Sequence, residues 1–175
     1  MIKIKVIIIN GSGGVGKSTF IELCKKYYDN TYELSMVDLI KDIARKYFNW
    51  NDNMKYDRHR KFLADLKDLI ENYDQYILYN YLDEEIDNCI FSSGHKESII
   101  FINARSPKDI SYLIEKYKVY EPKSLIITNP RKEKIISNHA DANVNNYNYD
   151  YHIINSGSLE DFESIAETFV NMLWK

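Results

Sequence analysis

Eight residues near the start of the chain combine glycine, lysine and serine at a spacing that suits phosphate chemistry. The run Gly11-Ser12-Gly13-Gly14-Val15-Gly16-Lys17-Ser18 fits the pattern G-x-x-x-x-G-K-[ST] without a mismatch. Glycines let the backbone come close to a ligand, and successive N–H groups beside a helix N-terminus form an anion site. In this pattern the lysine reaches the β- and γ-phosphates, and the serine hydroxyl holds Mg²⁺. The motif therefore predicts a site for ATP and Mg²⁺.

The segments on either side of this loop have the character that the motif requires. A β-branched apolar run, Ile4 to Ile9, precedes it, and Phe20, Leu23 and Cys24 follow it at helical spacing. Strand, glycine loop and helix in this order argue against a glycine-rich turn that merely precedes a helix. The residues that we expect to contact the nucleotide are Gly11, Gly13, Gly14, Val15, Gly16, Lys17, Ser18 and Thr19.

The composition narrows the class of protein. The 175 residues suit one domain, and the formal net charge of -3 argues against a binder of nucleic acid or of an anionic membrane surface. Cys24 and Cys89 form no metal-binding or CxxC pattern, so we interpret both as buried thiols. No signal peptide pattern and no apolar run long enough to span a bilayer is present, which predicts a cytoplasmic location.

Alternating strand and helix patterns predict an α/β fold. The expected strands cover 4–9, 31–34, 98–102, 124–128 and 151–154, with helices between them and a terminal helix after Ser158. Such a pattern predicts a five-stranded parallel sheet flanked by helices, the P-loop NTPase fold. Ligands of these sheets lie outside the carboxyl ends of the strands, where Gly11, Ser35, Arg105 and Asn155 would stand.

The single predicted domain has three parts. Its core comprises 1–35, 98–128 and 151–175. Residues 36–97 carry mostly helical patterns and are far longer than the dozen or so residues that a crossover needs. We therefore expect a helical insert that holds a second substrate. The polar stretch 129–150 has little apolar periodicity and is predicted to be a lid.

Three classes of enzyme could use such a loop. A GTPase would need an Asn-Lys-x-Asp base reader, and Thr128-Asn129-Pro130-Arg131 lacks the lysine and the aspartate. A motor ATPase or helicase would normally have an apolar strand that ends in aspartate, and no predicted strand does. A small-molecule kinase needs an acceptor pocket and arginines that neutralise two phosphate groups, and this chain offers both.

The chain resembles phage-type deoxynucleoside monophosphate kinases, which are relatives of the adenylate and guanylate kinases. The resemblance rests on the loop, on four further segments, and on nearly the whole length of the chain. These segments are the run 60–67 (RKFLADLK), the Arg105-x-Pro107 turn, the run 137–141 (SNHAD) and the run 148–151 (NYDY). The resemblance implies an adenylate kinase-like fold and transfer of the γ-phosphoryl group of ATP to a deoxynucleoside 5′-monophosphate, which gives the diphosphate.

Three basic residues are the candidates for catalysis. Lys17 serves the donor, and Arg105, just past a predicted strand end, would grip the acceptor phosphate. Arg131 begins the predicted lid and could act as an arginine finger. A surface salt bridge for Arg105 and a solvated loop charge for Arg131 are the alternatives. His139 could contact phosphate or tie down the lid.

The other candidates for binding the acceptor, together with Arg105, are Ser35, Asp38, Arg60 and Asp65. Arg60 could form a second phosphate clamp, although it could also belong to a solvated helix face. Asp38 and Asp65 could accept hydrogen bonds from the base or the sugar, and Asp38 could instead cap a helix that starts near Ser35. The sequence leaves three questions open: the base preference, the choice between ribose and deoxyribose, and whether the protein forms a homodimer.

Two departures from the resembled family affect these expectations. The strand from Ser98 ends in Asn103, so the usual acidic partner of Mg²⁺ is missing there. Ser18, phosphates and water could hold the metal alone, or Asp38 could assist. Ser106 stands between Arg105 and Pro107, where an acid is frequent, which bears on substrate preference. Dephospho-coenzyme A, a shikimate-like alcohol or phosphomevalonate as acceptor, and a non-catalytic ATP-binding regulator, are the alternatives.

Overall fold

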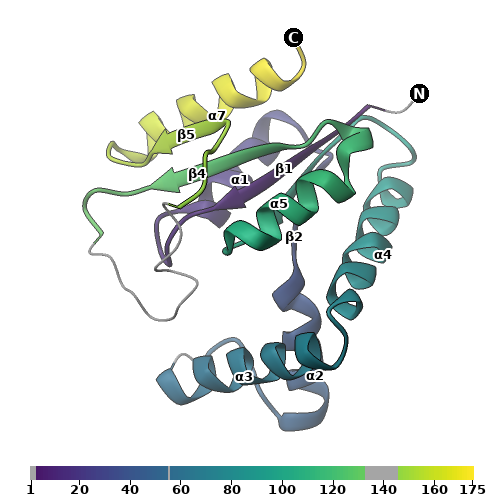
Figure 1. Ribbon diagram of the computed structural model, residues 1–175. Coiled ribbons are helices and arrows are strands. Elements are labelled where there is room, and N and C mark those ends of the chain that lie inside the picture. The colour runs from purple at the N-terminus through teal and green to yellow at the C-terminus, as the bar shows by residue number, and fades with distance from the viewer. Residues whose placement is uncertain (1–2, 55, 133–145) are drawn as a thin grey trace. The chain divides into compact units, whose positions relative to one another are not determined.

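A single parallel sheet organises the chain in the computed structural model, which describes residues 3–54, 56–132 and 146–175. Its five strands stand in the order β2-β3-β1-β4-β5 (Figure 1). They are β1 (Ile4–Asn10), β2 (Thr31–Ser35), β3 (Ser98–Asn103), β4 (Lys123–Thr128) and β5 (Tyr151–Ile154). The predicted α/β fold is confirmed, and each strand lies within a residue or two of its expected bounds.

The register of the strands gathers their carboxyl ends at one edge of the sheet. Ile9 of β1 pairs with Asn103 of β3, and Asn10 pairs with Ile126 of β4. Thr128, the last residue of β4, pairs with Ile154 of β5 in the same parallel sense. The segments that follow these strands therefore leave the sheet at a common edge, where the glycine loop also begins.

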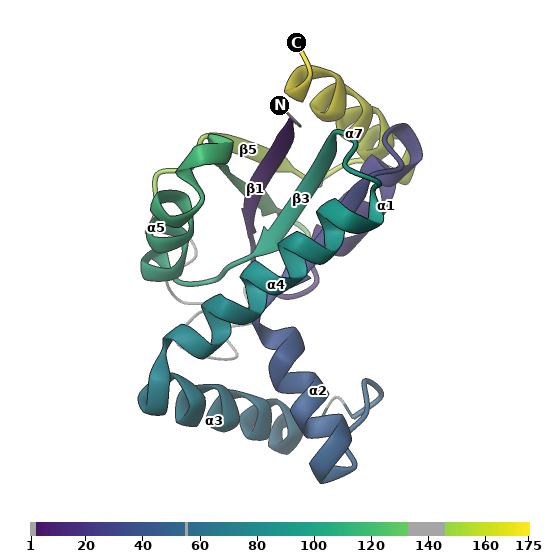
Figure 2. The same cartoon turned by 90° about the vertical axis from the view of Figure 1, so that its right-hand side faces the viewer.

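Helices cover both faces of this sheet (Figure 2). On one face, α1 (Lys17–Tyr27) packs beside α7 (Leu159–Leu173), and their apolar sides bury Phe20 and Phe169. On the other face, α5 (Pro107–Lys116) packs on β1 and β4. The short 3-10 helix η1 (Lys118–Tyr120), which the sequence did not predict, joins α5 to β4.

Serine side chains cap both α5, after Ser106, and the terminal helix α7, which was predicted to follow Ser158. The Ser106 hydroxyl accepts a hydrogen bond from the Asp109 N–H, and Pro107 occupies the first helical turn, where its missing N–H costs nothing. Ser158 and Asp161 form a reciprocal capping box at the start of α7. These local signals explain why the helix bounds were predictable.

Contacts divide the chain into two compact units. The sheet unit comprises residues 1–33 and 90–175, and the helical unit comprises residues 34–89. The helical unit contains α2 (Met36–Phe48), α3 (Asp57–Asp74) and most of α4 (Tyr76–Ser92). Within it, α2 packs against α3, which has no fully buried residue. Among the described residues, no helix is long and apolar enough to cross a membrane.

Candidate nucleotide-binding site

The loop between β1 and α1 adopts a conformation that depends on its glycines, most clearly on Gly11 and Gly16. Gly11 has a φ of 143° and Gly16 a φ of 108°, both in the region that side chains with a Cβ rarely adopt. A Cβ on Gly11 would also collide with the Ile127 carbonyl, and one on Gly16 would lie 2.6 Å from the Asn155 amide nitrogen. The loop is thus packed tightly against β4 and against the segment that follows β5.

The first turn of α1 adjoins this loop and contains no acidic residue. Gly16 is the N-cap residue and has no side chain to cap the helix. The N–H groups of this turn and the positive end of the helix dipole can therefore bind an anion. Lys17 extends back over the loop, and its ammonium group donates to the carbonyl oxygens of Gly11 and Ser12.

Asn10 connects the loop to two neighbouring segments. Its side chain is fully buried and donates to the Arg105 carbonyl oxygen at 3.2 Å and to the Tyr149 hydroxyl at 2.7 Å. Its Oδ1 atom accepts from the Gly11 N–H at 2.7 Å. Burial raises the pKa of the Tyr149 phenol, so the hydroxyl stays protonated. The sequence analysis missed Asn10, although an amide at the end of an apolar strand was a usable signal.

Asn155 fixes the loop from the other side. Its side-chain amide donates to the Val15 carbonyl oxygen at 2.9 Å, and its backbone N–H donates to the Thr128 carbonyl oxygen at 2.8 Å. The sequence predicts only that Asn155 stands at the carboxyl edge of the sheet. The structure places Asn155 against the phosphate loop itself, so the backbone of the loop is held at both of its ends.

A carboxylate that the sequence analysis missed lies beside Ser18. The Ser18 hydroxyl donates to Oε1 of Glu33 at 3.0 Å, and the Asn103 amide donates to the same oxygen at 2.8 Å. Glu33 is half-buried and belongs to β2, next to β3 in the sheet. A single glutamate inside a short strand at the site edge was the available signal. No group of three metal-binding side chains occurs among the described residues.

The candidate acceptor residues occupy both units. Arg105 is exposed directly after β3, in the sheet unit. At the start of α2, the Ser35 hydroxyl caps the helix by accepting from the Val37 N–H, and Asp38 pairs with Lys41 at 3.0 Å. On α3, Arg60 is exposed. Asp65, also on α3, pairs with Lys61 at 2.7 Å.

The predicted lid lies partly outside the described residues. These omit 133–145, and therefore His139. At the start of the segment, the Arg131 N–H donates to the Asn129 side chain at 2.9 Å, and the Arg131 residue is exposed. At its end, Asp150 accepts hydrogen bonds from the N–H and the hydroxyl of Ser124. Arg131 therefore follows β4 at the carboxyl edge of the sheet.

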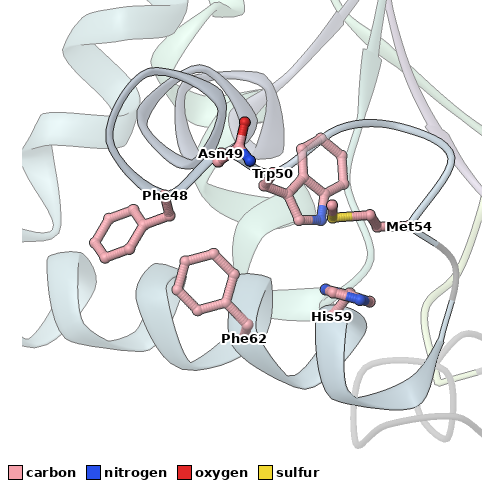
Figure 3. Close-up of a pocket in the computed structure, with 6 residues that line it drawn as sticks. All are labelled: Phe48, Asn49, Trp50, Met54, His59 and Phe62. Carbon is pink, nitrogen blue, oxygen red and sulfur yellow. The ribbon is translucent and has the colours of Figure 1, made fainter.

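The helical unit contains a pocket of about 370 Å³ with aromatic walls, shown in Figure 3. Trp50 is 8% exposed, and its indole N–H has no hydrogen-bond partner in the described part of the chain. In Figure 3 the indole nitrogen lies on the side of the ring toward Met54 and His59. The residues that line the pocket are Phe48, Asn49, Trp50, Met54, His59 and Phe62.

The strand order and the phosphate loop after β1 define a P-loop NTPase fold. No protein-family model and no curated protein matches the chain. Among solved structures, a mutant APS kinase from Mycobacterium tuberculosis is similar, with a TM-score of 0.48, 13% identity and 100% of both chains covered. The tunicamycin resistance protein of Deinococcus radiodurans gives a TM-score of 0.49 and 12% identity, over 98% of this chain and 96% of the other.

Proposed function

We propose that this protein is a kinase that transfers the γ-phosphoryl group of ATP to a nucleoside or deoxynucleoside 5′-monophosphate, which gives the diphosphate. The observation that carries the proposal is the phosphate loop, with Lys17 and Ser18 at the carboxyl edge of the sheet. An acceptor arginine, Arg105, follows the adjacent strand β3. Positive charge and hydrogen-bond donors thus gather where such sheets bind ligands.

The donor side needs little rearrangement to bind ATP. The Lys17 ammonium group would exchange the carbonyl oxygens of Gly11 and Ser12 for phosphate oxygens, which carry more negative charge. Phosphoryl transfer requires in-line positioning and neutralisation of charge rather than covalent catalysis by the protein. A loop held by Asn10 and Asn155 supplies that positioning, because its N–H groups are oriented before the nucleotide arrives.

The side chains present fit Mg²⁺. This ion prefers oxygen ligands and is usually held by one or two carboxylates together with phosphates and water. Ser18 offers a hydroxyl oxygen, and Glu33 offers a carboxylate hydrogen-bonded to that hydroxyl. When bound, the ion would neutralise charge on the β- and γ-phosphates.

Arg105 suits an acceptor phosphate. A guanidinium group can bind two phosphate oxygens at once, and the Arg105 side chain is exposed rather than buried in the core. The Asn10 side chain holds the Arg105 carbonyl oxygen at 3.2 Å, so the backbone of the acceptor arginine is tied to the start of the donor loop. Arg131 follows β4 and would add a further positive charge at the same edge of the sheet.

The aromatic pocket supports a nucleotide as the acceptor. The aromatic faces of Phe48 and Phe62 can stack on a base. Arg60 lies on the same turns of α3 as the pocket residues His59 and Phe62. The helical unit thus offers a ring site and a cation close together, which are the two features that a nucleoside monophosphate requires.

The test is ADP release from Mg·ATP against a panel of acceptors. The panel contains the four common dNMPs, the matching NMPs, dephospho-coenzyme A, shikimate and phosphomevalonate. We expect turnover on at least one nucleoside monophosphate, and the panel then identifies the base and the sugar. Turnover restricted to a non-nucleotide acceptor would contradict the proposed acceptor. ATP binding without turnover on any acceptor would contradict the kinase proposal and favour an ATP-binding regulator.

A further inference from the structure

We propose that Glu33 is the acidic residue of the Mg²⁺ site. The chain would then supply this carboxylate from β2 and not from the end of β3. The inference rests on the proposed binding of ATP at the phosphate loop. The end of β3 carries Asn103, which has no charge, so a metal site there would lack a carboxylate. Glu33 lies within hydrogen-bond distance of both Ser18 and Asn103 and supplies that charge.

The hydrogen bond between Ser18 and Glu33 prepares the hydroxyl for a cation. A serine hydroxyl has one proton to donate and two lone pairs to offer. Its proton points to Oε1 of Glu33 at 3.0 Å, which leaves the lone pairs for other partners. A negatively charged acceptor also makes the hydroxyl oxygen a better ligand, because it draws on the O–H proton.

Asn103 orients Glu33 and would be a poor place for a second acid. Its amide donates to Oε1 at 2.8 Å, the same oxygen that accepts from Ser18. A carboxylate at position 103 would stand against Glu33 and repel it. The second oxygen of Glu33, Oε2, has no hydrogen-bond partner among the residues described, so it can accept from water bound to the metal.

The charge balance around Glu33 also points to a cation. In the described part of the chain no lysine, arginine or histidine forms an ion pair with this half-buried carboxylate, and both of its hydrogen-bond donors are neutral. A partly buried charge is costly without a compensating charge. Asp38, the other acid considered for the metal, already pairs with Lys41 at 3.0 Å. Mg²⁺ would supply the missing counter-charge of Glu33.

The test is Mn²⁺ binding to the complex of the protein with a non-hydrolysable ATP analogue, followed by electron paramagnetic resonance. We expect Glu33→Gln to raise the Kd for Mn²⁺ by roughly 10- to 100-fold, the usual effect of losing such a residue. Affinity for the analogue in EDTA should not fall, because no phosphate contact is removed. This second readout separates loss of the metal site from loss of the proposed ATP site.

Two further variants make the experiment specific. Glu22→Gln is the matched control, because it removes the same charge from an exposed glutamate. Glu22 lies on α1 and pairs with Lys25. This variant should bind Mn²⁺ like the wild type. The double variant Glu33→Gln with Asn103→Asp moves the carboxylate back to β3, and it should recover Mn²⁺ affinity to within about 10-fold of wild type.

Three outcomes would overturn the inference. Glu33→Gln with wild-type Mn²⁺ affinity would make the carboxylate a structural partner of Ser18 alone. An equal loss in Glu22→Gln would assign the effect to general surface charge. A loss in Asp38→Asn but not in Glu33→Gln would move the acid to α2. Failure of the analogue to bind even in EDTA would instead contradict the proposed function, and thermal unfolding of each variant checks that it is folded.

Discussion

The two units use polar side chains in opposite ways. In the sheet unit, Asn10, Asn103 and Asn155 make hydrogen bonds to residues far away in the sequence, at the edge where the phosphate loop lies. In the helical unit, the ion pairs on α2 and α3 join mostly residues three or four positions apart, as between Lys61 and Asp65. Long-range bonds fix one geometry, whereas exposed local pairs contribute only about 0.2–1 kcal/mol each.

The apolar residues show the same contrast. Four residues of α1 are buried, including Phe20 and Cys24, whereas α3 has no buried residue. Burial raises the pKa of the Cys24 thiol to about 12, which keeps it protonated and inert. Helix α1 therefore packs into a core, whereas α3 lies at the surface of the helical unit, which also exposes rings such as Phe48 and Tyr73. Under the proposed function, the difference suits a donor site with fixed geometry and an acceptor helix that adapts to its ligand.

The largest expected effect is a loss of activity on substitution of Lys17, in the sheet unit. Lys17→Ala should lower kcat by roughly 10³-fold, because it removes the charge that would stabilise the transferring phosphate. The measurement is steady-state kinetics on the best acceptor of the panel. Lys25→Ala, which removes an exposed lysine from the same helix, is the control and should retain activity. Comparable activity in the two variants would disprove the donor role of Lys17.

The next largest expected effect is on stability, and it should differ between the sheet unit and the helical unit. Phe20 is fully buried, with ring centroids of Phe162 and Phe169 5.4 and 5.5 Å away, so Phe20→Ala should lower the free energy of unfolding by about 3–5 kcal/mol. Phe62→Ala removes the same ring from a half-buried pocket wall and should cost about 1 kcal/mol. Denaturant unfolding measures both values. Equal losses would show that the helical unit is as tightly packed as the sheet unit.

Arg105→Ala should weaken binding of the acceptor and leave binding of ATP nearly unchanged. Loss of a charged hydrogen bond to the acceptor phosphate predicts a KM for the acceptor that is roughly 10- to 100-fold higher, since such bonds contribute about 1.5–3 kcal/mol. The KM for ATP should change little, because the loop contacts remain. If only the KM for ATP rises, Arg105 belongs to the donor side.

The smallest expected effect depends on pH. Burial alone would raise the pKa of Asp150, but hydrogen bonds from the Ser124 N–H and hydroxyl lower it below its usual 3.8. A lowered pKa in the folded state adds stability above the unfolded value, and this gain is lost as pH falls through the folded value. Asp150→Asn should therefore cost roughly 0.5–1 kcal/mol at pH 7, because the side chain is partly solvent-exposed.

The check on Asp150 is thermal unfolding across a pH series. The difference between wild type and Asp150→Asn should shrink as pH falls below about 4, where the carboxyl of the wild type is also neutral. A difference that persists unchanged in acid would mean that the amide disrupts packing rather than removing a charge. Lys123 lies 3.9 Å from Asp150, so added salt should weaken the effect slightly.

Most of the fold was predictable from short-range patterns. The apolar strand predicted over 4–9 and the cap predicted at Ser158 are local features, and the structure reproduces them within a residue. In the candidate site, the local pattern predicted the loop but not the carboxylate beside it. Glu33 was missed because its partners, Ser18 and Asn103, lie 15 and 70 positions away in the sequence, and no local pattern brings them together.

The sequence by itself determined the strand, glycine loop and helix that form the candidate phosphate site, because the glycines act through backbone geometry over a few residues. It also determined the alternation of strands and helices, because periodicity reports which face is buried. Only the tertiary structure decided which polar groups meet at the edge of the sheet. Asn10 reaches Tyr149, and Asn155 reaches Val15, because parallel strands bring their carboxyl ends together whatever their separation along the chain.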